Sequence, residues 1–108
     1  MKKKRDYKFT EDKILETIKS HIDSTYTEHY ARGKYQATDM ILDAGHGEGF
    51  CIGNIMKYAM RYGKKNGKNP NDLLKIIHYA IIALYLTGKQ DDGRSDRQET
   101  LPRYMYRL

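Results

Sequence analysis

The sequence has no tryptophan, two prolines and one cysteine among its 108 residues. A single cysteine excludes a disulfide within the chain. Cys51 lies in an apolar run, and no residue near it in the sequence would lower the pKa of its thiol, which argues against a catalytic role. We therefore expect a buried, reduced thiol.

Long apolar runs are also missing. The longest, from Ile76 to Leu86, contains a histidine and two tyrosines and is shorter than the roughly 20 residues that cross a bilayer. The charged N-terminus has no apolar segment behind it, so we do not expect it to be a signal peptide. We expect a soluble cytoplasmic protein that has no membrane partner. A Gly-x-x-x-x-Gly-Lys-Ser/Thr loop is absent too, which excludes a P-loop kinase.

What the chain has in excess is basic charge, with 20 Lys and Arg against 14 Asp and Glu and a net charge of +6. The basic residues gather at the N-terminus and between Lys57 and Lys68. Such a balance favours phosphate-bearing partners and does not choose between nucleic acid and small nucleotides. The length predicts one domain, which we divide into a flexible basic arm (1–9), a helical domain (10–88) and a polar connector with a C-terminal tail (89–108).

Apolar spacing predicts four helices, over about 10–22, 37–44, 50–62 and 70–87, and leaves the form of 23–36 open. Thr10 is the expected N-cap of the first helix. We expect a flexible loop at Gly45–Gly49 and helix ends at Gly63 and Gly88. The fourth helix is apolar on more than one face, which a chain this small cannot cover by itself. The prediction is an all-α bundle completed by homo-oligomerisation.

The predicted third helix has two faces. Ile52, Ile55, Met56 and Ala59 share one side, which we expect to be buried. The other side carries a different set at helical spacing: Asn54, Lys57, Tyr58, Arg61 and Lys65. Cations neutralise phosphate and a tyrosine can stack on a ring, so this side suits a phosphorylated, ring-bearing ligand. The alternative is the plain solvated side of an amphipathic helix.

The segment from His29 to Tyr85 resembles a family of small phage proteins, known largely as a domain of unknown function, a few larger members of which bear the name nucleotide kinase. The residues that carry the resemblance are His29-Tyr30, Gly33, Asp39, Gly53-Asn54, Lys57-Tyr58, Arg61, Gly63, Asp72-Leu73, Lys75 and Tyr79. The glycine-rich loop at Gly45–Gly49 departs from the family pattern. The resemblance implies a helical, oligomeric phage protein of the host cytoplasm that handles nucleotides.

The kinase name implies phosphoryl transfer from a nucleoside triphosphate, brought with its Mg²⁺, to a deoxynucleoside monophosphate. Arg61 is a candidate catalytic cation, and His29, Asp39 or Asp72 could orient an attacking oxygen. Each has a plain alternative, since His29 could hold a loop and both aspartates suit helix starts. Tyr30 and Tyr79 are equally candidates for stacking on a base or for core edges.

Metal binding by the chain itself has little support, because His46 and Glu48 make only two potential ligands. We predict no metal site and no certain cofactor. Two other functions remain open beside the kinase. One is a non-catalytic protein that sequesters a nucleotide of host defence. The other, less favoured, is a nucleic-acid-binding accessory protein, for which the sequence shows a basic arm and no recognised reading module.

Overall fold

A computed structural model describes residues 5–31 and 34–92, with side chains described for 5–28 and 37–88. It contains four helices: α1 (Glu11–Ala31), α2 (Lys34–Asp43), α3 (Gly47–Arg61) and α4 (Pro70–Asp92). No strand occurs within the described residues. The predicted all-α class is therefore confirmed.

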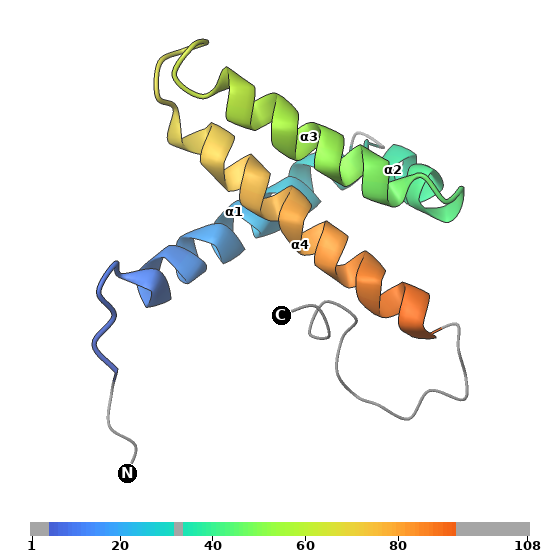
Figure 1. Ribbon diagram of the computed structural model, residues 1–108, viewed down its shortest axis with the longest axis horizontal. Helices are drawn as coiled ribbons and strands as arrows, with labels where there is room; N and C mark the ends of the chain where they lie inside the picture. The colour runs from blue at the N-terminus through green and yellow to red at the C-terminus, as the bar shows by residue number, and fades with distance from the viewer. Residues whose placement is uncertain (1–4, 32–33, 93–108) are drawn as a thin grey trace.

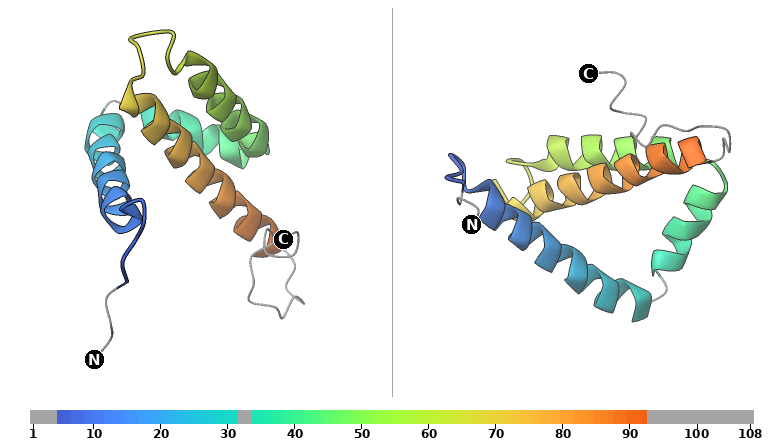
Figure 2. Two further views of the ribbon diagram at one scale, coloured as in Figure 1. Left: turned by 60° about the vertical axis from the view of Figure 1, so that its left-hand side comes forward. Right: turned by 90° about the horizontal axis from the view of Figure 1, so that it is seen from below.

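The helices α3 and α4 form an antiparallel pair joined by the short loop after Arg61 (Figure 1). The helix α1 crosses α4, and α2 returns the chain from the far end of α1 to the start of α3. Seen from below, α1, α2 and the α3–α4 pair outline a triangle (Figure 2, right). The closest packing is between α3 and α4, so this pair is the frame on which the other two helices are placed.

The helix α1 is longer than predicted, because the polar segment that follows Ile22 stays helical to Ala31. Thr25 is buried and continues the spacing of Ile18 and Ile22, which explains how a polar stretch still packs. Thr10 does not cap the helix with its side chain, because its hydroxyl donates to the Phe9 carbonyl instead. Glu11 accepts the Phe9 backbone N–H in the first turn.

The predicted glycine loop at Gly45–Gly49 is wrong. Gly45 has φ +90° and closes α2, with its N–H on the Leu42 carbonyl and the N–H of His46 on the Ile41 carbonyl. These two bonds form a Schellman motif. Gly47 is already the first residue of α3, and it is buried. A Cβ there would lie 2.6 Å from Cδ1 of Leu86, so close packing against α4 is what requires this glycine.

The other breaks are placed by local signals. Gly63 has φ +86° directly after α3, as predicted. Asn69 precedes α4 and accepts the N–H of Asn71 on its side chain and the N–H of Asp72 on its carbonyl. Gly88 does not stop α4, which continues to Asp92. A glycine costs about 1 kcal/mol inside a helix, which a long packed helix can absorb.

The apolar core of the described residues is small. Only Ile18 and Cys51 are buried apolar side chains, while thirteen large apolar side chains are exposed. The expectation of a buried Cys51 is thereby confirmed. Within the described part of the chain, no helix combines the length and the apolar character that a bilayer-spanning segment requires.

Candidate functional site

The face of α3 that packs on α4 is not the one that its amphipathicity predicts. Ile52 and Met56, expected in the core, are 45% and 58% exposed, and Ala59 is exposed as well. Tyr58 and Arg61, expected to face solvent, are half-buried toward α4. The reason is that α4 offers this side aromatic and charged partners rather than aliphatic ones.

The centre of the α3–α4 contact is the ring of Tyr58. It lies nearly parallel to the ring of Tyr79 on α4, with centroids 6.3 Å apart and an interplanar angle of 14°. Three cations surround the same ring: Nζ of Lys57 at 5.0 Å, Nζ of Lys75 at 5.1 Å and the Arg61 guanidinium carbon at 5.8 Å. We call Tyr58 with Lys57, Arg61 and Lys75 the Tyr58 cluster. Cations at such distances are attracted to the ring quadrupole and concentrate positive charge around Tyr58.

One of the three cations already has a carboxylate partner. Nε of Arg61 lies 3.5 Å from Oδ1 of Asp72 at the start of α4. The Asp72 side chain is only 3% exposed and that of Arg61 is 29% exposed, so the pair is largely shielded from water. Asp72 thus does more than favour the helix start, since it also holds Arg61 beside the Tyr58 ring. Lys57 and Lys75 carry the charge of the cluster that Asp72 does not balance.

The Tyr58 cluster borders a cleft of about 420 Å³ where α1 and α2 meet the α3–α4 pair. Tyr58 and Lys75 line it directly. The rest of the α4 wall consists of His78, Tyr79 and Ile82, which follow Lys75 at helical spacing. Clefts of this size hold small organic ligands in proteins.

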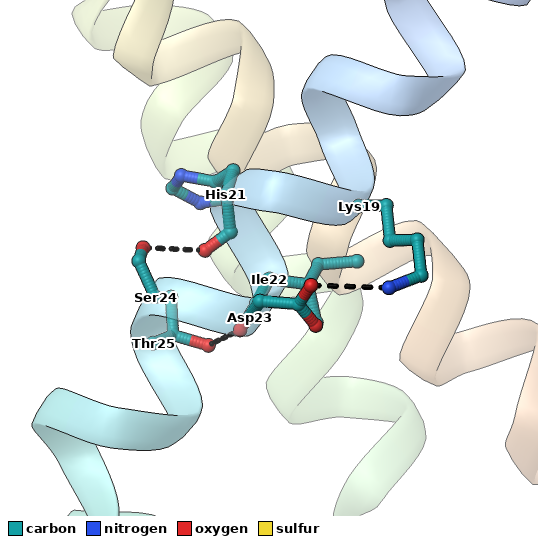
Figure 3. Close-up of polar contacts among 6 residues, drawn as sticks. All are labelled: Lys19, His21, Ile22, Asp23, Ser24 and Thr25. Carbon is teal, nitrogen blue, oxygen red and sulfur yellow. Dashed lines mark hydrogen bonds and ion pairs between the residues drawn. The ribbon is translucent and has the colours of Figure 1, made fainter.

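The opposite wall comes from α1, with His21, Ser24, Thr25 and Glu28, and Thr38 adds a hydroxyl from α2. The Ser24 hydroxyl donates to the His21 carbonyl, and that of Thr25 donates to the Ile22 carbonyl (Figure 3). These bonds fix the orientation of both hydroxyl groups. The two walls meet where the rings of His21 and His78 pack edge to face, 6.0 Å apart.

Other polar contacts of α1 lie away from this wall. Lys19 and Asp23 form an ion pair of 3.1 Å, and both side chains are exposed. In the close-up they point to the other side of the helix from His21 (Figure 3). The helix α1 therefore has a cleft side of hydroxyls and imidazole and a solvent side of exposed charge.

The predicted site residues fall into three groups. Tyr58 and Tyr79 line the cleft, and Lys57 and Arg61 join them at the Tyr58 ring. Three others lie apart: the Asn54 amide donates to the Phe50 carbonyl within α3, and Lys65 and Asp39 are exposed and do not line the cleft. The side chains of His29 and Tyr30 are outside the described residues.

Reasoning from the sequence missed most of the cleft as a site. The missed residues are His21, Ser24, Thr25, Glu28, Thr38, Lys75, His78 and Ile82. A signal was present on α1, where His21, Ser24, Thr25 and Glu28 place polar groups at i, i+3, i+4 and i+7. On α4 the polar groups stop at i+4, with Lys75, His78 and Tyr79, and Ile82 follows at i+7. Periodicity alone does not reveal that the two stripes face each other across a cleft.

The described residues contain no group of three or more His, Cys, Asp or Glu side chains that could hold a metal ion. Cys51 lies on α3 and is fully buried, and this burial raises the pKa of its thiol. A thiol that resists ionisation is a poor nucleophile. The chemistry of the cleft is therefore that of lysine, imidazole, hydroxyl and one carboxylate.

Comparison with known protein families identifies a segment of the chain. The model of a family described as a protein of unknown function, DUF3310, matches residues 24–81, more than half of the chain. The matched segment includes the Tyr58 cluster and nearly all of the cleft. No curated protein and no solved structure matches the chain.

Proposed function

The chain belongs to the DUF3310 family, whose function is unknown, and from the geometry of its cleft we propose that it binds a nucleotide. The observation that carries the proposal is the Tyr58 cluster, where Lys57 and Lys75 approach one aromatic ring to 5.0 and 5.1 Å at the edge of a cleft of about 420 Å³.

The two lysines suit the phosphate end of the ligand. An ammonium group is a compact charge with three donors that can contact phosphate oxygens from several directions. Arg61 is less available, because Asp72 balances its charge. Phosphate bound at Lys57 and Lys75 would exchange cation–π contacts for stronger charge-assisted hydrogen bonds.

The interior of the cleft suits the sugar and base. It offers hydroxyls at Ser24 and Thr25, the imidazoles of His21 and His78, and the ring of Tyr79. Hydroxyl and imidazole groups both donate and accept hydrogen bonds, as a ribose and the edge of a base require. Flat rings give stacking surfaces to a base. A small phosphorylated, ring-bearing molecule therefore fits both the charge and the chemistry of the site.

Phosphoryl transfer is the second candidate, in line with the name nucleotide kinase that a few larger members of the resembled phage family bear. The observation that favours it is Glu28 in the cleft wall together with two imidazoles, because these groups can take a proton from an attacking hydroxyl. The triphosphate would bring Mg²⁺ as its own companion. Sequestration of a nucleotide corresponds to the same binding without turnover.

The test is isothermal titration calorimetry of the full chain with deoxynucleoside mono- and triphosphates. The charge-removing variant is Lys57→Met/Lys75→Met, and the matched control is Lys13→Met/Lys64→Met, which removes two exposed lysines outside the Tyr58 cluster. A hydrogen bond to a charged group contributes roughly 1.5–3 kcal/mol. Loss of two such contacts weakens binding at least a hundredfold, since about 1.4 kcal/mol corresponds to a factor of ten.

The outcomes separate the proposed functions. Binding that is lost in the cluster variant and kept in the control supports a nucleotide site in the cleft. A mixture of mono- and triphosphate with Mg²⁺ then shows, by chromatography of the products, whether phosphate is transferred. Absence of binding by every nucleotide, or equal loss in both variants, contradicts the proposal. Binding only of long oligonucleotides, abolished by the control variant as well, would point to nucleic acid instead.

A further inference from the structure

The side of α4 that faces away from α3 carries an apolar seam with coiled-coil spacing. Its residues are Leu74, Ile77, Ile81, Leu84 and Gly88, separated by three, four, three and four positions. At 3.6 residues per turn they fall on one narrow stripe of the helix. The seam runs for about 21 Å, at roughly 1.5 Å per residue.

The seam is partly open to solvent in the single chain, with Leu74, Ile77 and Gly88 half-buried and Ile81 and Leu84 exposed. Ile81 is 42% exposed and Leu84 46% exposed, and Leu73 and Tyr85, which flank the stripe, are exposed as well. Lys75, the one Lys, Arg, Asp or Glu between Leu73 and Gly88, lies at the cleft on another side of α4. The stripe has no polar side chain, and its exposed part leaves apolar surface in contact with water.

The other sides of α4 have partners within the chain. Tyr79 stacks on Tyr58 of α3, and Leu86 lies against Gly47. His78 packs on the ring of His21 of α1. Among the described residues, the views in Figures 1 and 2 show no helix running along the remaining side of α4. This side of α4 is therefore available to a partner.

We propose that a second copy of the chain covers this face, with α4 packed antiparallel on α4 of its partner. A stripe with spacing of three and four is complementary to a helix that has the same spacing, because the knobs of each fill the holes of the other. The interface is then isologous and closed, which forms a dimer rather than a fibre. It also shields apolar groups of a chain in which Ile18 and Cys51 are the buried apolar side chains of the described part.

The charges at the ends of α4 decide the direction. Lys89, Asp91 and Asp92 lie in the last turn of the helix, with a net charge of −1, whereas Lys64, Lys65 and Lys68 lie in the loop before it. A parallel pair would gather the net negative charge of both helix ends at one end and the lysines of both loops at the other. An antiparallel pair centred on Ile81 places each acidic end beside the basic loop and the positive N-terminal end of the other α4.

The interface is independent of the nucleotide site, because the seam and the cleft occupy different sides of α4. The test uses disulfide cross-linking in the full chain, where the native Cys51 is fully buried. Ile81 lies at the centre of the seam, so Ile81→Cys places two thiols face to face in the dimer. The matched control is Met56→Cys, an exposed side chain on the outer side of α3.

Under mild oxidation at micromolar concentration, we expect most of the Ile81→Cys protein to migrate as a covalent dimer and little of the Met56→Cys protein to do so. Equal cross-linking of both, or preferential cross-linking of Met56→Cys, would overturn the proposal. Sedimentation equilibrium gives a second readout, with a species of twice the 12.7 kDa chain mass for the natural protein and a monomer for Ile81→Lys. A natural protein that sediments as a monomer at all concentrations also overturns it. Neither readout depends on nucleotide.

Discussion

Replacing Arg61 should destabilise the fold more than replacing Asp72, although the two side chains form one ion pair. Nε of Arg61 and Oδ1 of Asp72 are 3.5 Å apart. At an effective dielectric constant of about 20, two unit charges at that distance attract by about 5 kcal/mol before the cost of desolvation is subtracted. That cost falls mainly on Asp72, whose side chain is 3% exposed against 29% for Arg61.

The asymmetry follows from what each substitution leaves behind. Arg61→Met leaves a buried carboxylate without its cation, for which we expect a loss of about 3 kcal/mol in the free energy of unfolding. Asp72→Asn keeps a side-chain oxygen available to the buried Nε of Arg61, whose side chain is 29% exposed, and we expect a loss of about 1 kcal/mol. The double variant Arg61→Met/Asp72→Leu should lie closer to the natural protein than Arg61→Met does, because no buried charge remains.

The assay is urea unfolding followed by circular dichroism at 222 nm, with all variants at one protein concentration because association shifts apparent stability. Lys57→Met is the control, since Lys57 contacts the same Tyr58 ring and has no carboxylate partner in the described residues. Its loss should cost less than about 1 kcal/mol. The reasoning is refuted if Asp72→Asn is as damaging as Arg61→Met.

Further predictions concern two glycines and the cysteine. Gly47→Ala should lower the free energy of unfolding by about 1–2 kcal/mol, because the new Cβ lies 2.6 Å from Leu86 Cδ1. In Gly53→Ala the new Cβ meets no atom within 4 Å, so this variant should raise the free energy of unfolding by about 0.5–1 kcal/mol. The same urea titrations measure both variants, and an equal effect of the two substitutions would contradict this account. Cys51 should react with Ellman's reagent slowly in the native protein and fully in urea. Because burial raises the pKa of this thiol, the unfolded chain ionises first, so stability should fall as pH rises through the ordinary thiol pKa, and Cys51→Ala should remove that part of the decline.

The helices were predictable where the signals are local. Asn69 and Pro70 mark the start of α4, and Gly63 marks the end of α3, because their conformational preferences act within a few residues. The role of Gly47 was not predictable in this way. It depends on Leu86, which is distant in the sequence, and the local pattern of glycines indicated a loop instead.

The candidate site shows the same division. Helical spacing placed Lys57, Tyr58 and Arg61 together correctly, since they belong to one helix. It assigned the wrong side of α3 to the core, because burial there is decided by Tyr79 and Asp72 on α4 rather than by the hydrophobicity of α3. The α1 wall of the cleft could not be predicted in this way. It forms only because several helices pack together, and the residue pattern of one helix gives no information on that packing.

The most direct test of the nucleotide site asks whether Lys57 and Lys75 recognise phosphate. Isothermal titration calorimetry would compare thymidine with its monophosphate, in the natural protein and in Lys57→Met/Lys75→Met. We predict that the phosphate strengthens binding to the natural protein at least tenfold and that the variant loses this gain, while Lys13→Met/Lys64→Met keeps it. A phosphate gain that survives in Lys57→Met/Lys75→Met would contradict the assignment of these lysines to the phosphate, and with it the proposed mode of binding.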